Sequence, residues 1–587
     1  MKARKTLRRR DVPEGAEALL PRVPAVLRRV YAARGVREPS ELTLALSGLL
    51  PPSGLQGIGP LAAVLADAVQ AGQSILVVGD FDADGATSTA LVLRALRRLG
   101  ATRVDYLVPN RFEYGYGLTP EIVAVAATRA PDLILTVDNG VTSVAGVDAA
   151  RALGIRVVVT DHHLPGACLP KADAMINPNL PGDTFASKAL AGVGVAFYAM
   201  AALRGELRAR GWFTADRPEP NLAELLDLVA LGTVADVVPL DRNNRALVAQ
   251  GLARIRSGRA APGILSLFAV AGRDPRQAVA SDLGFAIGPR LNAAGRLDDM
   301  SLGIECLLTD DPRRAREWAE RLDELNRERR EIETDMQARA LEQLGPLLAA
   351  RGWSEGQVSS VPEALVLFDA DWHPGVIGIL AGRLKERLHR PVIVLAQEGE
   401  EGEGLLRGSA RSIPGLHLRD ALEVVDARHP GLILRFGGHA MAAGLTLHRE
   451  ALESFTRCFT EVVRESVEEA DLQGVLLSDG ELAAEDITLE LAQQLREGGP
   501  WGQHFPEPLF DGVFEVAECR AIGHGRHQRL VLTPPGEPER RFEAVLFNHR
   551  EDELPGGRFW RVAYRLDVNV FRGSSRCQLV LEHVEAA

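Results

Sequence analysis

The chain has 587 residues, of which 46% are hydrophobic and 25% are charged. This length is too great for one hydrophobic core, so about three or four domains are expected, and no uninterrupted apolar run is long enough to span a bilayer. The formal net charge of -12 argues against a protein that coats nucleic acid non-specifically. It is compatible with a nucleic-acid enzyme whose binding surface is locally positive.

The N-terminal region and the cysteines carry little chemistry. Residues 1–10 are basic, but no apolar segment follows them, so we interpret them as a solvated tail and not as a secretory signal. Residues 11–70 are expected to form a helical lead-in. The five cysteines are scattered without a CxxC pair. This pattern predicts neither a zinc knuckle nor a disulfide framework, and it fits a reducing cytoplasm.

Three carboxylates follow the first clear strand. Residues 75–78 are a continuous apolar run, typical of a parallel strand covered on both faces. Asp80, Asp82 and Asp84 come next at alternating positions, before a helix expected over 86–99. Ligands bind beyond the carboxyl ends of such strands, and like charges this close repel one another unless a cation or hydrogen bonds compensate. One aspartate that caps the helix is the simpler alternative, but it explains one carboxylate and not three.

The same arrangement recurs in the next hundred residues. Strands are expected at 104–108, 133–137, 157–160 and 174–176, alternating with helical segments, which predicts βαβ units and a parallel sheet. The polar residues that follow these strands are Asn110 and Arg111, Asp138 and Asn139, Asp161, His162 and His163, and Asn177. Because the carboxyl ends of parallel strands share one edge, we expect these side chains to converge on one crevice.

The two adjacent histidines are the least common of these features. A lone histidine is more often a core residue than a ligand, but beside these carboxylates we favour the ligand interpretation. Adjacent residues leaving a strand point to opposite sides, so His162 and His163 are expected to differ in role. Asp138 alone would equally fit a turn. Asp236, after the apolar run 225–231, is a further candidate, although a surface-loop aspartate would look identical.

Two later segments separate this region from the second half of the chain. Residues 288–296 hold Arg290, Asn292 and Arg296 among small residues, which suits close approach of a phosphate. An exposed loop with ordinary surface arginines is an alternative of nearly equal weight. Residues 311–348 interleave acids and bases in a helix-forming sequence, which predicts a long solvated connecting helix and not a nucleic-acid patch.

A second α/β unit is expected from residue 364 onward, with strands at 365–368 and 391–395 around a helix at 375–388. Its loops carry side chains and glycines suited to phosphate binding, namely His373, Arg407, Ser409, Arg411, Gly437, Gly438 and His439. Gly-Gly-His followed by an alanine-rich helix would present backbone N–H groups to an anion. A packing pair of glycines is the alternative interpretation.

The C-terminal region is rich in predicted strands. Apolar alternation occurs at 513–516, 529–532, 542–547, 559–564 and 566–571. Five short strands predict a small barrel of the OB type, a fold that binds single strands. Its aromatic residues and arginines would supply a stacking platform, although most of the aromatic residues are expected in the core; they are Phe547, Trp560, Tyr564, Phe571, Arg561 and Arg572.

Taken in order, several of these motifs resemble a known superfamily. Segments 80–85 (Asp-Phe-Asp-Ala-Asp-Gly), 138–140 (Asp-Asn-Gly), 161–163 (Asp-His-His) and 232–236 (Gly-Thr-Val-Ala-Asp) resemble the four motifs of the DHH phosphoesterases. Segments 290–296, 372–375 and 437–439 resemble the associated C-terminal domain of that superfamily. With 109–112, 501–503 and 505–508, the set is similar to the bacterial RecJ family over about residues 40–550.

The resemblance implies a site with two divalent ions, Mn²⁺ or Mg²⁺. The positions that map onto metal ligands are Asp82, Asp84, Asp138, His162 and Asp236, with Asp138 as the bridge. Asp80 and His163 map onto positions that contact the ions or the scissile phosphate, and Asp161 would orient a neighbour. Carboxylates together with imidazoles favour Mn²⁺ over a purely oxygen-ligated Ca²⁺ site. Two ions would support in-line displacement at phosphorus without a protein nucleophile.

The fold class implied is α/β: a parallel-sheet DHH domain, a second α/β DHH-associated domain joined by a long helix, and a C-terminal β-rich OB-like domain. The expected segments are an N-terminal helical lead-in (1–48), the DHH catalytic domain (49–260), connecting helices (261–350), the DHH-associated domain (351–460), and a linker with the OB-like domain (461–587).

The function implied is 5′-to-3′ exonucleolytic hydrolysis of single-stranded DNA to mononucleotides, in DNA recombination and repair. Arg111 and Tyr116 would recognise the 5′ end, and a helicase and a single-strand-binding protein are the expected partners, with no membrane involved. The residues alone fit DNA and RNA equally, so the preference for DNA rests on the resemblance.

Two other functions stay open at this point. A DHH phosphoesterase that acts on short oligonucleotides, pyrophosphate or cyclic dinucleotides is disfavoured by the additional β-rich domain. A non-catalytic nucleic-acid scaffold is disfavoured because every motif position is filled.

Overall fold

A computed structural model describes residues 5–15, 20–110, 117–350, 361–398, 404–571 and 573–587. Contacts between residues divide the chain into two compact units. The larger unit comprises residues 10–326 and 478–587, and the smaller unit comprises residues 1–9 and 327–477. The C-terminal region therefore packs with the first half of the chain, although a long stretch of sequence separates them.

A five-stranded parallel sheet forms the first part of the larger unit, as predicted. Its strands, in spatial order, are β3 (Arg103–Leu107), β2 (Ser74–Val78), β4 (Leu133–Val137), β5 (Arg156–Thr160) and β6 (Ala174–Ile176). The chain leaves β2 toward β3 on one side and then returns to place β4 on the other side. This reversal of strand order opens a crevice beyond the carboxyl ends of β2 and β4, where ligands bind in open α/β sheets.

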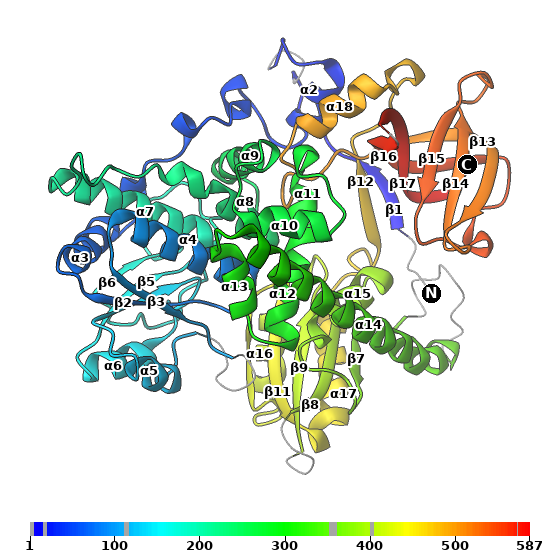
Figure 1. Ribbon diagram of the computed structural model, residues 1–587. Helices are drawn as coiled ribbons and strands as arrows, with labels where there is room; N and C mark the ends of the chain where they lie inside the picture. The colour runs from blue at the N-terminus through cyan, green and yellow to red at the C-terminus, as the bar shows by residue number, and fades with distance from the viewer. Residues whose placement is uncertain (1–4, 16–19, 111–116, 351–360, 399–403, 572) are drawn as a thin grey trace. The chain divides into compact units, whose positions relative to one another are not determined.

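Apolar side chains of the sheet enter two cores, one on each face. Ile75 and Val77 belong to one buried cluster, and Leu76 and Val78 belong to another. This alternation explains the continuous apolar run of β2, since each fully buried aliphatic side chain contributes about 1.5–3 kcal/mol. Figure 1 shows α3 (Ile58–Gln70), α4 (Ala83–Leu99) and α7 (Gly192–Ala209) on one side of the sheet, and α5 (Pro120–Ala127) and α6 (Val144–Ala152) on the other.

Helices and short turns make up the rest of the larger unit before the barrel. They include α2 (Ala25–Ala32), α8 (Leu226–Ala235), α9 (Arg242–Arg256), α10 (Pro262–Val270), α11 (Ala280–Asp282), the π-helical turn η6 (Leu283–Ile287), α12 (Gly288–Leu297), α13 (Ser301–Leu308) and α18 (Leu489–Glu497). The long helix predicted at 311–348 is confirmed as α14 (Pro312–Ala350). Among the described residues no single helix is long and apolar enough to cross a membrane; one pair, Leu46–Gly54 with Ile58–Gln70, passes by length and composition but is bent by 90°.

A closed five-stranded barrel ends the chain. Its strands are β13 (Phe510–Ile522), β14 (His527–Thr533), β15 (Phe542–Leu546), β16 (Phe559–Phe571) and β17 (Ser574–Ala586), in the order β13-β14-β15-β17-β16. The prediction of a five-stranded barrel is confirmed, but two of its strands were wrong. Residues 559–564 and 566–571 form one long strand, and the fifth strand is 574–586. A bulge between Ala563 and Tyr564 shifts the register there and breaks the alternation that suggested two strands.

The smaller unit is built on a mixed sheet of β10 (Arg435–Gly438), β11 (Ala442–His448), β9 (Leu405–Arg411), β8 (Val392–Glu398) and β7 (Leu365–Phe368), in that order. Only β7 and β8 are parallel. The helices of this unit are α15 (Ile377–Leu388), α16 (Leu418–Arg428) and α17 (Leu452–Ser466). Residues 5–9, expected as a solvated tail, form the strand β1 (Lys5–Arg9), which pairs with β12 (Gly474–Ser478).

Candidate metal centre

The loop after β2 turns directly into α4, which begins at Ala83 and not at residue 86 as predicted. The Asp82 side chain caps this helix by accepting a hydrogen bond from the Gly85 N–H at 2.9 Å. Capping therefore coexists with the carboxylate cluster, and the two interpretations of the sequence are not exclusive. The earlier start places Asp84 in the first helical turn, where it is 1% exposed.

Asp84 is held by the N-terminus of a second helix. Its Oδ2 accepts a hydrogen bond from the Gly192 N–H at 2.6 Å, and its Oδ1 accepts one from Val193 at 2.9 Å. Both donors belong to the first turn of α7, where the helix dipole also favours an anion. Residue 192 must be glycine, because a Cβ there would lie 2.5 Å from Oδ1 of Asp138. The glycine-rich start of this helix was the overlooked signal in the sequence.

Asp138 follows β4 in a left-handed backbone conformation, with φ of 62°. An aspartate tolerates this conformation better than most residues, and the Asp138 N–H donates to the Thr160 carbonyl at 3.1 Å. The neighbouring Asn139 is fully buried and its Nδ2 donates to the carbonyls of Val78 and Val137. Asn139 thus ties the ends of β2 and β4 together, a role that the sequence did not reveal.

The carboxylate of Asp161 organises the loop after β5. Its Oδ1 accepts hydrogen bonds from the backbone N–H groups of His162 and His163 and contacts Nδ1 of His163 at 2.8 Å, while its Oδ2 accepts one from Val141. Burial acts to raise the pKa of Asp161, but the hydrogen bond and charge of His163 prevail and lower it. Asp161 therefore orients the two histidines.

His162 reaches the carboxylates, as the sequence predicts for at least one histidine. Its Nε2 lies 3.0 Å from Oδ1 of Asp138, 3.6 Å from Oδ2 of Asp236 and 3.9 Å from Oδ2 of Asp84. Asp236 is the C-cap residue of α8, so the end of a helix and not of a strand positions its carboxylate.

Three overlapping groups in the described part of the chain have geometry suited to a metal ion. They are Asp84, His162 and Asp236; Asp80, Asp82 and Asp138; and Asp138, His162 and His163, each with its ligand atoms within 4.8 Å of one another. Asp138 and His162 each belong to two groups, so the three groups are neighbours that share ligands. Oxygen donors with one or two imidazoles suit Mn²⁺ or Mg²⁺.

The electrostatics of the site also call for a cation. Burial and the charge of Asp82 raise the pKa of Asp84 to about 7. Burial, followed by the charges of neighbouring aspartates, raises the pKa values of Asp138 and Asp236 well above the ordinary value. Carboxylates in such an environment hold protons unless a positive ion replaces them. The residues present therefore fit a divalent metal site.

The segment 290–296 lies against this site as helix α12, so the exposed-loop alternative is wrong. The buried Arg290 donates from Nε to Oδ1 of Asp323 at 2.9 Å, and Oδ1 of Asn292 accepts a hydrogen bond from the Ala83 N–H at 2.8 Å. A Cβ at residue 295 would lie 1.8 Å from the Phe81 carbonyl oxygen. The contacts of Asn292 and Gly295 support the loop that carries Asp82 and Asp84. Phosphate binding by Arg290, Asn292 or the half-buried Arg296 stays a prediction.

In the smaller unit, the predicted phosphate ligands gather on and beside one sheet. Arg407, Ser409 and Arg411 alternate along β9 and so share one face. Ser409 Oγ lies 3.2 Å from Nη1 of Arg411, and a Cβ at Gly378 near the start of α15 would meet both side chains. His373 precedes this helix, and its Nδ1 accepts a hydrogen bond from Gly375 N–H.

The alanine-rich helix predicted after Gly-Gly-His is wrong. Gly437 and Gly438 belong to β10, and a tight hairpin closed by the His439 N–H and the Ala442 carbonyl leads into β11. Gly438 has φ of 146°, and a Cβ there would lie 2.4 Å from the Ala442 carbonyl, so the hairpin requires glycine. The small residues that suggested a helix are needed for close strand pairing.

Other predicted binding residues have different settings. Arg111 and Tyr116 lie outside the described residues. In the barrel, Trp560 and Tyr564 are 4% and 0% exposed and belong to the core, as expected for most of its aromatic residues, whereas Phe547 is 49% exposed. Arg561 pairs with Asp511 at 3.5 Å.

Comparisons with known proteins agree along the whole chain. Family models match residues 74–233 (DHH family, N-terminal domain), 361–465 (DHHA1 domain) and 478–583 (RecJ OB domain). The chain is 56% identical to the single-stranded-DNA-specific exonuclease RecJ of Dickeya dadantii over 98% of both chains. It is 52% identical to the Escherichia coli protein of the same name over 100% of both.

A solved structure has the same fold. The crystal structure of RecJ in complex with Mn²⁺ from Thermus thermophilus superimposes with a TM-score of 0.81 and 31% identity, covering 99% of this chain and 79% of that chain. A Mg²⁺ complex from the same organism has a TM-score of 0.74. Full-length identity above one half, the three domain matches and the acidic cluster lead to one assignment. The chain belongs to the RecJ family of single-stranded-DNA-specific exonucleases.

Proposed function

We propose that this chain is a metal-dependent exonuclease that hydrolyses single-stranded DNA from its 5′ end and releases mononucleotides, in DNA recombination and repair. The observation that carries the proposal is the group formed by the buried Asp84 and Asp138 with the half-buried His162 and Asp236. The relatives that match the full chain are named for this substrate, and the RecJ of Thermus thermophilus is solved with Mn²⁺ and with Mg²⁺.

Five side chains would hold two ions, Mn²⁺ or Mg²⁺: Asp82, Asp84, Asp138, His162 and Asp236. When bound, such ions activate water and neutralise the charge of a phosphodiester under attack. The protein supplies a rigid frame for them. Asp84 is fixed by two N–H groups of α7, and Asn292 on α12 holds the backbone between Asp82 and Asp84.

We assign His163 to the phosphate. Burial acts to lower its pKa, but the hydrogen bond and charge of Asp161 outweigh burial and raise it. The imidazole therefore keeps its proton to higher pH than an ordinary histidine. Since Nδ1 is directed at Asp161, Nε2 is the atom from which we expect donation to a phosphate oxygen. Asp80 lies with Asp82 and Asp138 in one of the groups suited to a metal ion.

The remaining predicted residues would bind the strand. In the smaller unit, Arg407, Ser409, Arg411, His439 and the N–H groups at Gly437 and Gly438 offer donors suited to phosphate. Arg111 and Tyr116 would recognise the 5′ end. The segment boundaries 49–260, 351–460 and 461–587 are proposed as the catalytic, DHH-associated and OB-like domains, and a helicase and a single-strand-binding protein are proposed as partners.

End-labelled oligonucleotides test the proposal directly. The protein with Mn²⁺ is incubated in parallel with 5′-labelled and 3′-labelled DNA and RNA of the same sequence. We expect immediate release of labelled mononucleotide from 5′-labelled DNA alone, and loss of the reaction in EDTA. Cleavage restricted to di- to tetranucleotides would reject the proposal and assign the chain to the small-substrate phosphoesterases.

A further inference from the structure

The turn after β6 contacts the backbone of the histidine loop, by which we mean residues 161–163. β6 pairs in parallel with β5, with Ile176 opposite Thr160, and this register places Asn177 beside the histidine loop. Asn177 is fully buried, and its Nδ2 donates a hydrogen bond to the His163 carbonyl at 2.8 Å. Asn177 therefore reaches the candidate metal centre through a backbone carbonyl and not as a ligand.

A second asparagine of the same turn holds the preceding carbonyl. Nδ2 of the half-buried Asn179 donates to the His162 carbonyl at 2.6 Å. The backbone N–H of Asn179 donates to Oδ1 of Asn177 at 2.8 Å. The side-chain amide of Asn177 is thus used at both ends, because its oxygen accepts within the turn while its nitrogen donates to the histidine loop. These two contacts fix the orientation of that amide.

The N–H groups of the histidine loop are held by Asp161. Its Oδ1 accepts from the His162 N–H at 2.7 Å and from the His163 N–H at 3.0 Å. The peptide group that joins the two histidines is therefore bound at its N–H by Asp161 and at its carbonyl by Asn179. Since a peptide group is planar and moves as one unit, its rotation would break both hydrogen bonds. The directions of the two imidazole rings are fixed in this way.

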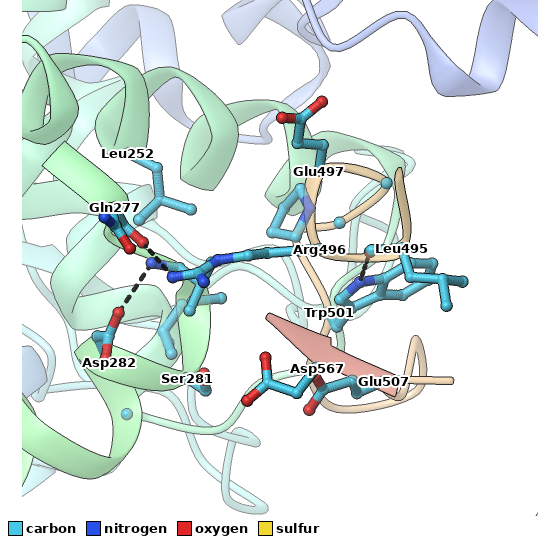
Figure 2. A pocket seen from close by; sticks show the side chains of 18 of the residues that line it. Leu252, Gln277, Ser281, Asp282, Leu495, Arg496, Glu497, Trp501, Glu507 and Asp567 are labelled. Carbon is cyan, nitrogen blue, oxygen red and sulfur yellow. Dashed lines mark hydrogen bonds between the residues drawn. The ribbon is translucent and has the colours of Figure 1, made fainter. Parts of the chain in front are cut away.

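A side chain that donates to a backbone carbonyl occurs elsewhere in the larger unit. Figure 2 shows one case, in which Nη2 of Arg496 donates to the Gln277 carbonyl at 2.9 Å in a pocket that both residues line. In another, Nε2 of Gln250 donates to the Leu44 carbonyl at 2.7 Å. Each of these contacts joins two segments at one point. The histidine loop differs, because four backbone groups of two adjacent residues are held by three side chains.

The turn itself is braced by Lys188. Its Nζ donates to the Pro178 carbonyl at 2.7 Å, to the Asp183 carbonyl at 2.8 Å and to Oδ1 of Asp183 at 2.7 Å. Oδ2 of Asp183 accepts from the Gln56 N–H at 2.7 Å, which anchors this carboxylate in turn. An ammonium group has three donors, and these contacts use all three. We therefore interpret Lys188 as support for the turn and not as a phosphate ligand.

We propose that Asn177 and Asn179 are positioning residues for the reaction. Asn179 orients His162 toward the metal ions, because it holds the peptide between the two histidines. Asn177 orients His163 toward the phosphate, because it holds the peptide that follows His163. Both asparagines act through the backbone and not by contact with an ion or with the strand. The inference rests on the proposed function, since it assigns supports to that same site.

Mn²⁺ binding without DNA tests Asn179. Isothermal titration calorimetry of the full chain with MnCl₂ measures the metal affinity, and we expect Asn179→Ala to raise the Kd about tenfold. In the His162→Ala background the same substitution should leave the Kd unchanged, because the ligand that Asn179 positions is gone. Gln250→Ala, which removes an amide-to-carbonyl hydrogen bond of α9, is the matched control and should bind as the wild type does.

Two results of this titration would overturn the role of Asn179. One is a Kd for Asn179→Ala equal to that of the wild type. The other is an equal loss of affinity in the His162→Ala background, which a general loosening of the fold would produce. Urea unfolding in EDTA, run on each variant, separates such loosening from a local effect on the ligand.

Turnover of 5′-labelled DNA at saturating Mn²⁺ tests Asn177. We expect Asn177→Ala to lower kcat about tenfold, while its Kd for Mn²⁺ stays within about twofold of the wild-type value. In the His163→Ala background it should cause no further loss. Because Asn177 is buried, Asn177→Ser is measured beside it; its hydroxyl is too short to reach the His163 carbonyl, so the same loss is expected.

An unchanged kcat for both Asn177 variants, or a further loss in the His163→Ala background, would overturn the role of Asn177. A loss of Mn²⁺ affinity as large as that of Asn179→Ala would overturn the division of roles between the two asparagines. If the wild-type protein hydrolyses single-stranded DNA while these tests fail, only the inference is lost. If the wild-type protein binds Mn²⁺ but cuts no strand, the proposed function fails.

Discussion

Two buried carboxylate sites in the larger unit have opposite designs. Asp479, 4% exposed, is bound by both Nη atoms of Arg34 at 2.7 and 2.9 Å and accepts a hydrogen bond from the Leu509 N–H. Asp138, 2% exposed, lies among Asp80, Asp82, Asp84 and Asp236, with His162 as its nearby imidazole. The first site contains its own counter-charge, and the second one concentrates negative charge.

This difference separates a structural site from a functional one. A buried ion pair with good geometry compensates desolvation internally, and removal of one partner leaves an unpaired buried charge. Clustered carboxylates instead raise each other's pKa values, and they are stabilised in the charged form when a cation binds. The Arg34–Asp479 pair joins the region after α2 to the loop that follows β12, whereas the repulsion within the acidic cluster is relieved when a metal ion binds.

The largest effect is expected from a substitution that removes a metal ligand. Asp138→Ala should lower the rate of strand hydrolysis by more than about 100-fold. Substitution of residues that only hydrogen-bond to metal ligands already lowers metal affinity or activity about 10–100-fold. Strand binding should change little. The measurement is turnover of 5′-labelled DNA with Mn²⁺, beside anisotropy with the same strand. Full activity in this variant would remove the two-metal proposal.

Asp479→Ala tests the structural role of the Arg34–Asp479 ion pair. It leaves the Arg34 guanidinium, 1% exposed, buried without its carboxylate, and this should cost about 3–5 kcal/mol of unfolding free energy. Urea unfolding measures the loss. Asp138→Asn is the matched variant: in EDTA it should unfold at the same or higher urea concentration than wild type, because the neutral amide needs neither a counter-ion nor a bound proton in this buried acidic setting. A loss of stability in both would contradict the distinction.

Asn292→Ala should give an intermediate effect. The substitution removes the acceptor for the Ala83 N–H, which fixes the backbone between Asp82 and Asp84. We expect the Mn²⁺ concentration for half-maximal activity to rise about 10–100-fold, with the maximal rate at saturating Mn²⁺ less affected. Asn292→Asp keeps an acceptor and should recover part of the affinity. An unchanged Mn²⁺ requirement would exclude this positioning role.

The smallest effect is a pH dependence. The pKa of Asp84 is raised to about 7 in the fold, so between its ordinary value and pH 7 the folded state binds more protons than the unfolded state. Stability of the metal-free protein should therefore fall as pH rises from about 5 to about 8, whereas Mn²⁺ affinity should rise because binding displaces those protons. Thermal unfolding in EDTA and in Mn²⁺ across this range checks both signs; parallel curves would contradict the assignment.

The parallel sheet and the cluster at its edge were predictable because both depend on local pattern. A buried parallel strand leaves a continuous apolar run, as in β2, and its C-terminal polar residues stand out against that run. The long helix α14 was predicted from its charged, helix-forming composition, and the barrel from the alternation of apolar residues. The wrong predictions also have local causes: Gly437, Gly438 and their small neighbours suit a tight hairpin as well as a helix, and the bulge at Ala563 and Tyr564 hides the continuity of β16.

The residue types that bind metal occur in short motifs at the ends of strands, so the chemistry of the site can be predicted from local sequence. The partner of each side chain depends on how distant segments pack. Arg290 and Arg411 look alike in sequence, yet one is paired with Asp323 and the other lies beside Ser409. The support of the metal loop by Asn292 arises from a contact between residues far apart in the chain. Such contacts depend on packing, which no local pattern records.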